Sequence, residues 1–336
     1  KILTRERNYE KLAYYTVSMN KQLTHADLTE DLSFYRGSEQ VKKEMMNLTI
    51  AYGYRQGMYI KKEISDGIEF FSGKRAVETD LDKIILAWSK EYTSNYKNEV
   101  VPFSKLHRLV DRDNLHWVSH ALRDGYRDDA HCIPGVNLIC LDIENSVDID
   151  TAKLLLADYK WLMHTTKRHT DTSHRFRILI PMSHQLELDE RDYKEFMQNV
   201  FEWLPFDADT QTGQRSRKWM TCKGNFWYND GQLLDVLQFI PKTKKAEETK
   251  QTLSKLTNLT NLERWFVSTT KVGNRNQQLA KYAFACVGMG QDVQTIRNNV
   301  LALNNKIENP LDTVEIDSTI MISVTKRVAA RQGGHP

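Results

Sequence analysis

The sequence has few cysteines, little net charge and no long apolar segment. The four cysteines among 336 residues are far apart and lack the C-x-x-C spacing of zinc sites, so we expect reduced, buried thiols in a cytoplasmic protein. The net charge of +3 is too small to indicate a nucleic-acid-binding protein by composition alone. The longest apolar run, 136–143, is interrupted by Asn137 and Asp142 and is too short to span a bilayer, so we expect no membrane association.

Two functional signals are also missing. The first ten residues do not show the basic-then-apolar pattern of a signal peptide. The sequence has no G-x-x-x-x-G-K-[ST] motif, so these residues do not form a P-loop helicase.

The spacing of apolar residues divides the chain into four parts. Residues 1–100 are mostly helical, with a helix expected over 78–98, and form either an accessory region or the first part of the next domain. In 101–241, short β-branched runs alternate with amphipathic segments, which predicts an α+β domain. Residues 242–256 are polar and lack aromatics, as in a linker, and 257–332 have the spacing of a small all-helical domain.

A pair of carboxylates follows an apolar strand in the α+β part. Side chains alternate along a strand, so Asp142 and Glu144 lie on one face, about 7 Å apart, while Ile143 and its apolar neighbours lie on the other. Repulsion between the two charges is relieved by a divalent cation, and Mg²⁺ or Mn²⁺ prefers such oxygen ligands. The same pattern also fits an edge strand whose acids turn into solvent at Asn145 and Ser146.

A basic strand follows the acid pair. Arg175 and Arg177 share one strand face opposite Phe176, and with His169 just before them they could supply converging donors for a triphosphate. Each arginine taken singly also fits a solvated charge at a strand edge, and His164 and His174 weaken the signal of His169.

A third segment places acids directly before a basic cluster. Asp207 and Asp209 precede the run from Arg215 to Trp219, and a site that binds both metal ions and phosphates needs this combination. The segment also fits a capped loop followed by solvated charges.

The order of these segments resembles the archaeo-eukaryotic primase superfamily, in its phage and plasmid primase–polymerase branch. Its first motif matches Asp142 and Glu144, its second matches His169 with the strand 175–177, and its third matches Phe206, Asp207, Thr210 and Arg215. Lys167 stands where the family commonly has a small residue, and His174 gives a second possible registration. Residues 272–276, followed by 301–304 and a final helix, look like the primase C-terminal helical domain of such proteins, and the resemblance covers roughly 105–330.

The resemblance implies a fold and a chemistry. The expected core is an RRM-like mixed sheet flanked by helices, and the expected activity is template-directed nucleotidyl transfer that makes or extends primers on single-stranded DNA. Two Mg²⁺ or Mn²⁺ ions would be held by Asp142, Glu144 and Asp207, with Asp209 as the fallback ligand. Nucleoside triphosphates (NTP or dNTP) would be the substrates, and their phosphates would be bound by residues that include His169 as a catalytic side chain: His169, Arg175, Arg177 and Lys218.

We expect the template and primer to contact the basic and aromatic residues that follow the third motif. These residues are Arg215, Arg217, Lys223 and Trp219, with the aromatic run 226–228 beyond them. Trp219 also fits a core position. The resemblance further implies a replicative helicase as partner, either fused beyond Pro336 or separate. It also implies that a phage or mobile element encodes the protein, which would then act in the host cytoplasm.

Two other functions remain open from the sequence. A DEDD-type 3′–5′ exonuclease also has an opening strand that ends in D-x-E, but its later elements, imitated here by Asn199 with Asp207 and by His184 with Asp189, run in the wrong order. A non-catalytic replication-initiator or helicase-loading module could keep the same fold.

Overall fold

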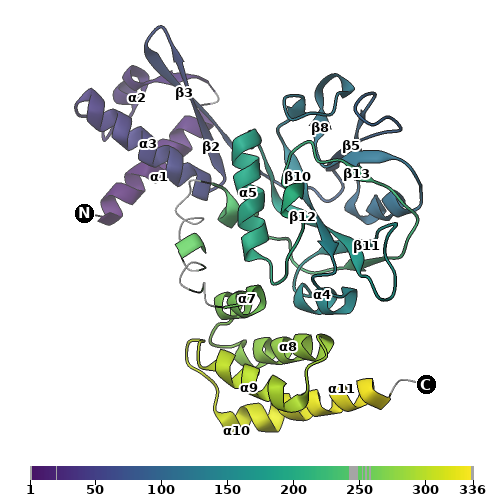
Figure 1. Cartoon of the computed structure of the whole chain (residues 1–336). Coiled ribbons are helices and arrows are strands. Elements are labelled where there is room, and N and C mark those ends of the chain that lie inside the picture. Colours follow the sequence, from purple (N-terminus) through teal and green to yellow (C-terminus); the bar gives the residue numbers. More distant parts are fainter. Residues whose placement is uncertain are drawn as a thin grey trace.

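The computed structural model describes residues 2–19, 21–241, 249–251, 253, 256 and 259–333. Figure 1 shows three successive parts: an N-terminal helix-and-hairpin part, a larger α+β part and a C-terminal group of helices. The expected linker, 242–256, lies mostly outside the described residues. None of the helices in the described ranges is long and apolar enough to cross a bilayer. All four cysteines are buried and free.

The N-terminal part has its own hydrophobic core. Its elements are α1 (Ile2–Ser18), β1 (Leu23–Thr24), α2 (His25–Asp31), α3 (Glu39–Arg55), β2 (Met58–Ser65) and β3 (Ile68–Arg75). The strands form an antiparallel sheet in the order β1-β3-β2. The hairpin turn is Asp66–Gly67, with φ of 50° and 75°, the dipeptide that suits a two-residue turn with positive φ. Buried side chains from the helices and the sheet meet in one cluster that includes Leu12, Leu28, Met46 and Phe71.

The prediction of a helix over 78–98 is wrong. The chain there forms β4 (Val77–Glu78), β5 (Ile84–Ser89) and the start of β6 (Lys97–Val101). β5 pairs with β6 on one side and with β7 (His116–Val118) on the other, and this burial overrides the local helical spacing. Because β5 and β6 belong to the second part, the boundary after the N-terminal part lies near residue 76 rather than residue 100.

Two sheets build the α+β part. The larger has the order β10 (Val136–Glu144), β12 (Arg175–Leu186), β11 (Trp161–Thr165), β14 (Phe226–Asn229), and β4 pairs with the end of β12. Its ladders are antiparallel, not mixed, and parallel pairing among the described residues is limited to the isolated bridges Tyr159–Gln232 and Met182–Leu234. The smaller sheet has the order β13 (Trp219–Met220), β7, β5, β6, and β8 (Ala121–Leu122) pairs separately with β9 (Cys132–Ile133).

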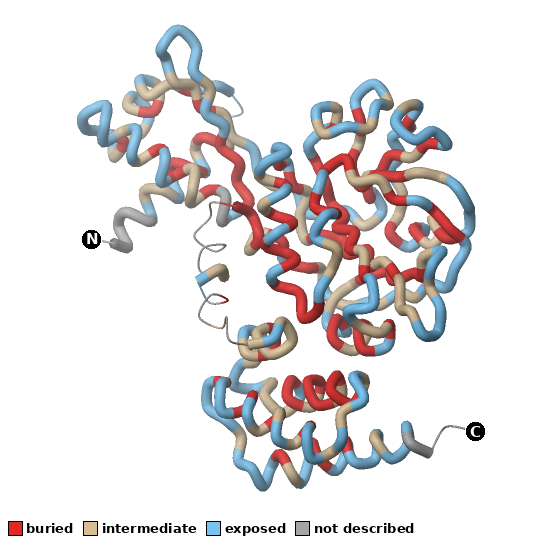
Figure 2. The backbone as a smooth tube through the Cα atoms, viewed as in Figure 1, coloured by how far each residue is buried: buried red, intermediate tan, exposed pale blue. Residues whose placement is uncertain are grey.

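The β10 strand is buried on both faces. Its odd-numbered apolar residues from Ile139 pack with helices α4 (Ile149–Leu155) and α5 (Glu190–Trp203), as the shared cluster with Phe196 and Val200 shows. Its even-numbered residues Leu138 and Cys140 pack against the smaller sheet. In Figure 2 the buried (red) segments are concentrated in the interior of the α+β part. Asp142 and Glu144 continue the second face, and along it Asp142 is partly buried whereas Glu144 is exposed.

The C-terminal part consists of packed helices, as the sequence predicts. They are α7 (Asn261–Thr269), α8 (Arg275–Gly288), α9 (Val293–Asn304), α10 (Thr313–Glu315), the π-helical turn η5 (Ile316–Met321) and α11 (Ile322–Gly333). Thr260 and Glu263 form a capping box at the start of α7, and Asp292 caps α9. Helix α8 lies against α4 of the α+β part, and the Lys281 Nζ is 2.7 Å from an Asp158 carboxylate oxygen.

Candidate nucleotide and metal site

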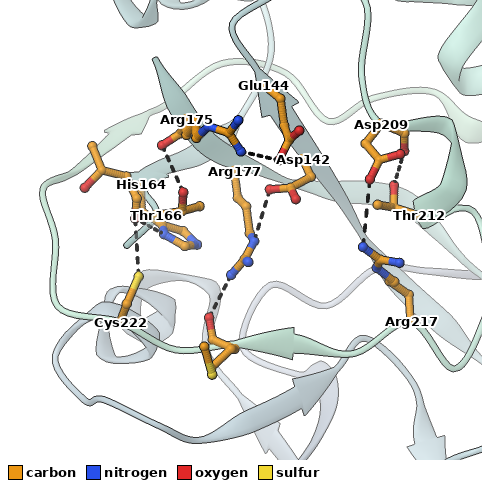
Figure 3. Close-up of polar contacts among 12 residues, drawn as sticks. Asp142, Glu144, His164, Thr166, Arg175, Arg177, Asp209, Thr212, Arg217 and Cys222 are labelled. Atoms are coloured by element: carbon orange, nitrogen blue, oxygen red, sulfur yellow. Dashed lines mark hydrogen bonds and ion pairs between the residues drawn. The ribbon is translucent and has the colours of Figure 1, made fainter. Parts of the chain in front are cut away.

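The antiparallel register of β10 and β12 brings the two acids opposite the two arginines. Asp142 is the cross-strand partner of Arg177, and Glu144 is the partner of Arg175. The Arg177 Nε lies 3.3 Å from Asp142 Oδ1, and the Arg175 Nη1 lies 2.7 Å from Glu144 Oε1 (Figure 3). Phe176, between the arginines, is fully buried on the other face, as the alternating pattern predicts.

The Asp142 carboxylate is partly buried among other charges. Burial raises its pKa, the Arg177 guanidinium lowers it, and the charges of Glu144 and Asp209 raise it further. The Glu144 side chain is more exposed than that of Asp142. An incompletely compensated carboxylate of this kind favours binding of further positive charge.

Asp209, rather than Asp207, lies beside Asp142. The Asp209 N–H donates to the Asp142 carbonyl oxygen at 2.9 Å, and the Asp209 carboxylate lies 3.8 Å from the Arg217 guanidinium. The short helical turn η3 (Thr210–Thr212) fixes this position, because the Asp209 side chain accepts from Gln211 N–H at its start.

Asp207 turns toward the C-terminal helices instead. Its carboxylate accepts from the Asn261 side chain at 2.5 Å. It lines a different cavity, of about 670 Å³, which lies between the α+β part and α7 to α9. The structure therefore brings the fallback acid, and not the first choice, to the acid pair.

The acids and arginines line a cavity of about 600 Å³. Its wall also includes Lys167 and Arg168, which are exposed and lie two and three residues after the end of β11. We did not predict that these two residues bind the substrate. The signal that could have identified them is their position between the end of a strand and His169. The ring of Trp219 lies 5.1 Å from the Arg177 guanidinium and 5.5 Å from that of Arg217, so a buried aromatic supports both cations.

His169 lies beside this cavity. Its Nδ1 accepts from the Arg175 backbone N–H at 3.2 Å, and its ring is 5.8 Å from that of His174. His169 lines a neighbouring cavity of about 380 Å³ together with Lys167 and Lys223. The histidine therefore orients the start of the arginine strand and faces an adjoining space.

Lys218, which we predicted to bind the nucleotide, does not line the cavity, and two of the predicted DNA-contacting residues, Arg215 and Trp219, are buried. Lys218 lies over the Tyr92 ring at 3.9 Å, and burial together with Arg127 and Arg217 lowers its pKa. Arg215 is buried and donates to the carbonyl oxygens of Leu188 and Asp129. Trp219 is also buried. The chain around β13 runs through the interior of the protein. Arg215 and Trp219 therefore pack inside the fold and are not on a surface that DNA could contact.

An exposed aromatic ledge lies on the edge strand β14. We define it as Phe226, Tyr228 and His107, the last from the helical turn η1 (Phe103–Val110). The rings of His107 and Phe226 stack at 5.2 Å with 19° between planes, and the Tyr228 hydroxyl accepts from the His107 N–H. The sequence did not predict His107 as part of this surface, because the residues that it contacts are more than a hundred positions away and no local pattern indicates such a contact.

The donor set at the cavity fits a hard divalent cation. Asp142 and Glu144 supply carboxylate oxygens to the cavity wall, and Asp209 lies next to the cavity without lining it. Mg²⁺ commonly takes one or two carboxylates, with water and substrate phosphates completing its shell. Among the described residues, no group of three or more His, Cys, Asp or Glu side chains is arranged to hold a metal ion. The protein ligands fit an ion that arrives with a phosphate-bearing substrate.

Sequence comparisons give two family matches. The family described as the VapE N-terminal domain matches residues 74–261, which is more than half of the chain. The family described as primase C terminal 1 (PriCT-1) matches residues 263–330. Comparisons with curated proteins and with solved structures gave no significant match. The first match begins where the N-terminal part ends, and the second covers α7 to α11 almost completely.

Proposed function

The chain belongs to the VapE N-terminal domain family and continues into a PriCT-1 domain, and from this premise we propose that it is a DNA primase of the primase–polymerase type. The two domains indicate a primase-related replication protein with the architecture of phage and plasmid primase–polymerases. The observation that carries the catalytic proposal is the register that places Asp142 and Glu144 opposite Arg177 and Arg175.

The proposed reaction is template-directed nucleotidyl transfer. The oxygen of a 3′-hydroxyl attacks the α-phosphorus of a nucleoside triphosphate, the hydroxyl proton is lost, and the bond to the pyrophosphate leaving group breaks. Asp142, Glu144 and Asp209 would hold Mg²⁺ or Mn²⁺, which lowers the pKa of the hydroxyl and neutralises phosphate charge when bound. Arg175 and Arg177 would bind and orient the phosphates.

The ion pairs suggest how the site accommodates its substrate. Each carboxylate is paired with an arginine from the next strand. A triphosphate that enters with its cations offers a better partner to both sides, because the phosphates can take the guanidinium groups and the carboxylates can take the cations. Lys167 and Arg168, on the cavity wall, would add positive charge for the distal phosphates.

Single-stranded DNA is the proposed template and the aromatic ledge is its proposed contact. Exposed rings stack on bases of any sequence, and the exposed Lys105, Arg108 and Lys223 provide charge for the backbone. Lys223 connects the two regions, because it lines the cavity that adjoins His169. Together with a replicative helicase as partner, this arrangement suits primer synthesis during replication of a phage or mobile element.

A direct assay tests the catalytic proposal. The chain is incubated with a single-stranded template, Mg²⁺ or Mn²⁺ and either NTPs or dNTPs, and the products are resolved on a gel. We expect nucleotide incorporation, lost in Asp142→Asn/Glu144→Gln and retained in the control Asp82→Asn/Glu308→Gln, whose acids are exposed elsewhere. Absence of incorporation by the unchanged chain would favour the non-catalytic initiator, and shortening of the template without nucleotides would favour the exonuclease. Two of the exonuclease-like residues are placed elsewhere: Asp189 caps α5 and Asn199 is buried.

A further inference from the structure

The N-terminal part, outside both family matches, has the element order of a winged helix. Helix α1 is followed by strand β1, helices α2 and α3, and the hairpin β2–β3, and the strands form the sheet β1-β3-β2. In such an arrangement α2 and α3 form a helix-turn-helix unit, and the hairpin forms a wing beside it. Figure 1 shows the tip of this hairpin extending away from the α+β part.

Buried contacts hold the two helices in a defined relation. His25, at the start of α2, contacts the Tyr35 hydroxyl at 2.6 Å and a Glu69 carboxylate oxygen of β3 at 2.9 Å. Tyr35, in the turn between the helices, is fully buried and its hydroxyl also donates to the Lys42 carbonyl oxygen of α3. These hydrogen bonds link α2, the turn, α3 and the wing, so that α3 presents a fixed surface.

The outer surface of α3 has a polar stripe. Gln40, Lys43 and Asn47 are exposed at spacings of three and four residues, so they follow one face, which starts in the first turn of the helix and also carries the exposed Glu44. These are side-chain types that read base edges in the major groove, glutamine and asparagine on adenine and lysine on guanine. Recognition helices contact bases with residues near their N-terminus.

Positive charge lies next to this stripe. Arg36 is exposed in the turn before α3, and neither Arg36 nor Lys43 forms an ion pair with another described residue. Lys61 of the wing is also exposed, where it pairs with Glu63 of the same strand. Glu39 is engaged by Lys42 at 3.6 Å, one turn along the helix. Phosphate contacts from such residues position a protein on a duplex without reading its sequence.

Within the described part of the chain, the α3 stripe and the tip of the β2–β3 hairpin form no hydrogen bond or ion pair with the α+β part, whereas Lys74 at the base of the hairpin pairs with Glu187. The N-terminal part meets the α+β part at the base of the hairpin, where Gly57 approaches Ala76 and Leu237, and at the contact of α3 with η4 (Val236–Phe239). Figure 2 colours the hairpin tip and the outer side of the helices as exposed. A duplex could therefore be bound here while the cavity beside β10 and β12 remains accessible.

We propose that residues 2–75 bind double-stranded DNA, with the Gln40–Lys43–Asn47 face of α3 in the major groove and the β2–β3 hairpin against the backbone. This binding would be separate from the proposed use of single-stranded DNA as template. It would hold the protein at chosen duplex sequences beside the strand that it copies.

The test uses the full chain and duplexes with a randomised central segment. Duplexes that the protein retains are recovered and sequenced, and affinities for an enriched and a scrambled duplex are measured by fluorescence anisotropy at fixed salt. We expect an enriched sequence, and Gln40→Ala/Lys43→Ala/Asn47→Ala should weaken its binding by about tenfold or more. The control Arg191→Ala/Lys194→Ala/Gln198→Ala, on the exposed face of α5, should bind like the unchanged chain.

Failure of this proposal is distinguishable from failure of the primase proposal. The Asp142→Asn/Glu144→Gln chain should bind the enriched duplex normally, and the α3 triple variant should keep nucleotide incorporation and its circular dichroism spectrum. The proposal is overturned if no duplex is enriched, or if binding survives the triple variant or is lost in the acid variant. Self-association that disappears with Val41→Asp/Leu48→Asp, without duplex enrichment, would identify the surface as a protein interface instead.

Discussion

Asp209 and Asp207 are two residues apart but have different surroundings. Asp209 is tied to the acid pair through the Asp142 backbone and faces Arg217, whereas Asp207 is bonded to Asn261 of the C-terminal part. Burial of Asp142 near Asp209 means that the charges of the two residues are coupled. We therefore assign the third carboxylate of the proposed site to Asp209.

Single substitutions of Asp209 and Asp207 test which of the two acids belongs to the proposed site. Asp209→Asn should lower nucleotide incorporation by about a hundredfold or more, because it removes a charged group that would stabilise the phosphate-bound cations. Asp207→Asn is the matched control and should retain incorporation within about threefold. Steady-state incorporation rates on a primed single strand measure both. Inactivation by Asp207→Asn alone would restore the assignment that the motif suggests.

His120 gives a prediction for stability against pH. It is fully buried against the Tyr193 ring, and burial together with the Arg215 charge lowers its pKa to about 3. The unfolded chain binds a proton here near pH 6.5 and the folded chain does not, so this contribution to stability is present above pH 6.5 and declines as pH falls. From pH 6.5 to 4 the loss is roughly 3 kcal/mol.

Denaturant unfolding at a series of pH values measures this effect. His120→Gln, which cannot be protonated, should show a shallower fall in unfolding free energy over the same interval. Its lower absolute stability does not affect the comparison of slopes. Equal slopes in the two proteins would contradict the assignment of this titration to His120.

At the scale of elements, the edge strand β14 determines where a single strand could lie. Among the described strands, β14 pairs with β11 alone, and Phe226 and Tyr228 are exposed beside η1. Phe226 has 40% of its surface exposed. Tyr126, which lies outside the aromatic ledge, is similarly exposed at 53% and is therefore a suitable control.

Phe226→Ala should weaken single-stranded DNA binding by about fivefold to a hundredfold, because one stacked base contributes roughly 1–3 kcal/mol. Tyr126→Ala should have no such effect. Fluorescence anisotropy with an oligothymidylate probe, repeated at two salt concentrations, checks both the loss and the expected weakening by salt. Equal losses in the two variants would argue against the aromatic ledge as the contact.

The secondary structure of β10, β12 and α5 follows from local pattern, and that of β5 does not. Alternating or continuous apolar residues in 136–143 and 175–181 predict strands that the structure confirms. Residues 84–89 have a spacing that also fits a helix. They form a central strand because β6 and β7 lie on either side, and this environment is contributed by residues outside the local window.

At the scale of the whole molecule, helix α8 attaches the C-terminal part to the α+β part. The Lys281 side chain is largely buried and is paired with Asp158, whereas Gly288 approaches the Thr151 hydroxyl so closely that a Cβ there would lie 2.3 Å from it. These contacts maintain the cavity that Asp207 and α7 share.

Loss of this attachment is testable. Lys281→Ala should lower the unfolding free energy by about 1–2 kcal/mol, reduced from the value of a fully buried pair because Asp158 is half exposed. It should also make the segment between the two parts cleave faster in limited proteolysis. Lys326→Ala, at an exposed position of α11, is the control for both measurements. Unchanged proteolysis in Lys281→Ala would show that the other α4–α8 contacts are sufficient.

Local pattern alone was enough to locate the acid pair, the arginine strand, the alternation of side chains along each of these strands and the helical C-terminal part. These features depend on residues within a few positions of one another, where the period of a strand or helix decides which side chains share a face. Folding of distant segments was needed to select Asp209 over Asp207, to bury Arg215 and Trp219, and to join His107 to Phe226. It also closed residues 2–75 around a separate core. Burial and cross-strand pairing are properties of the assembled fold, and no window of sequence contains the partners that create them.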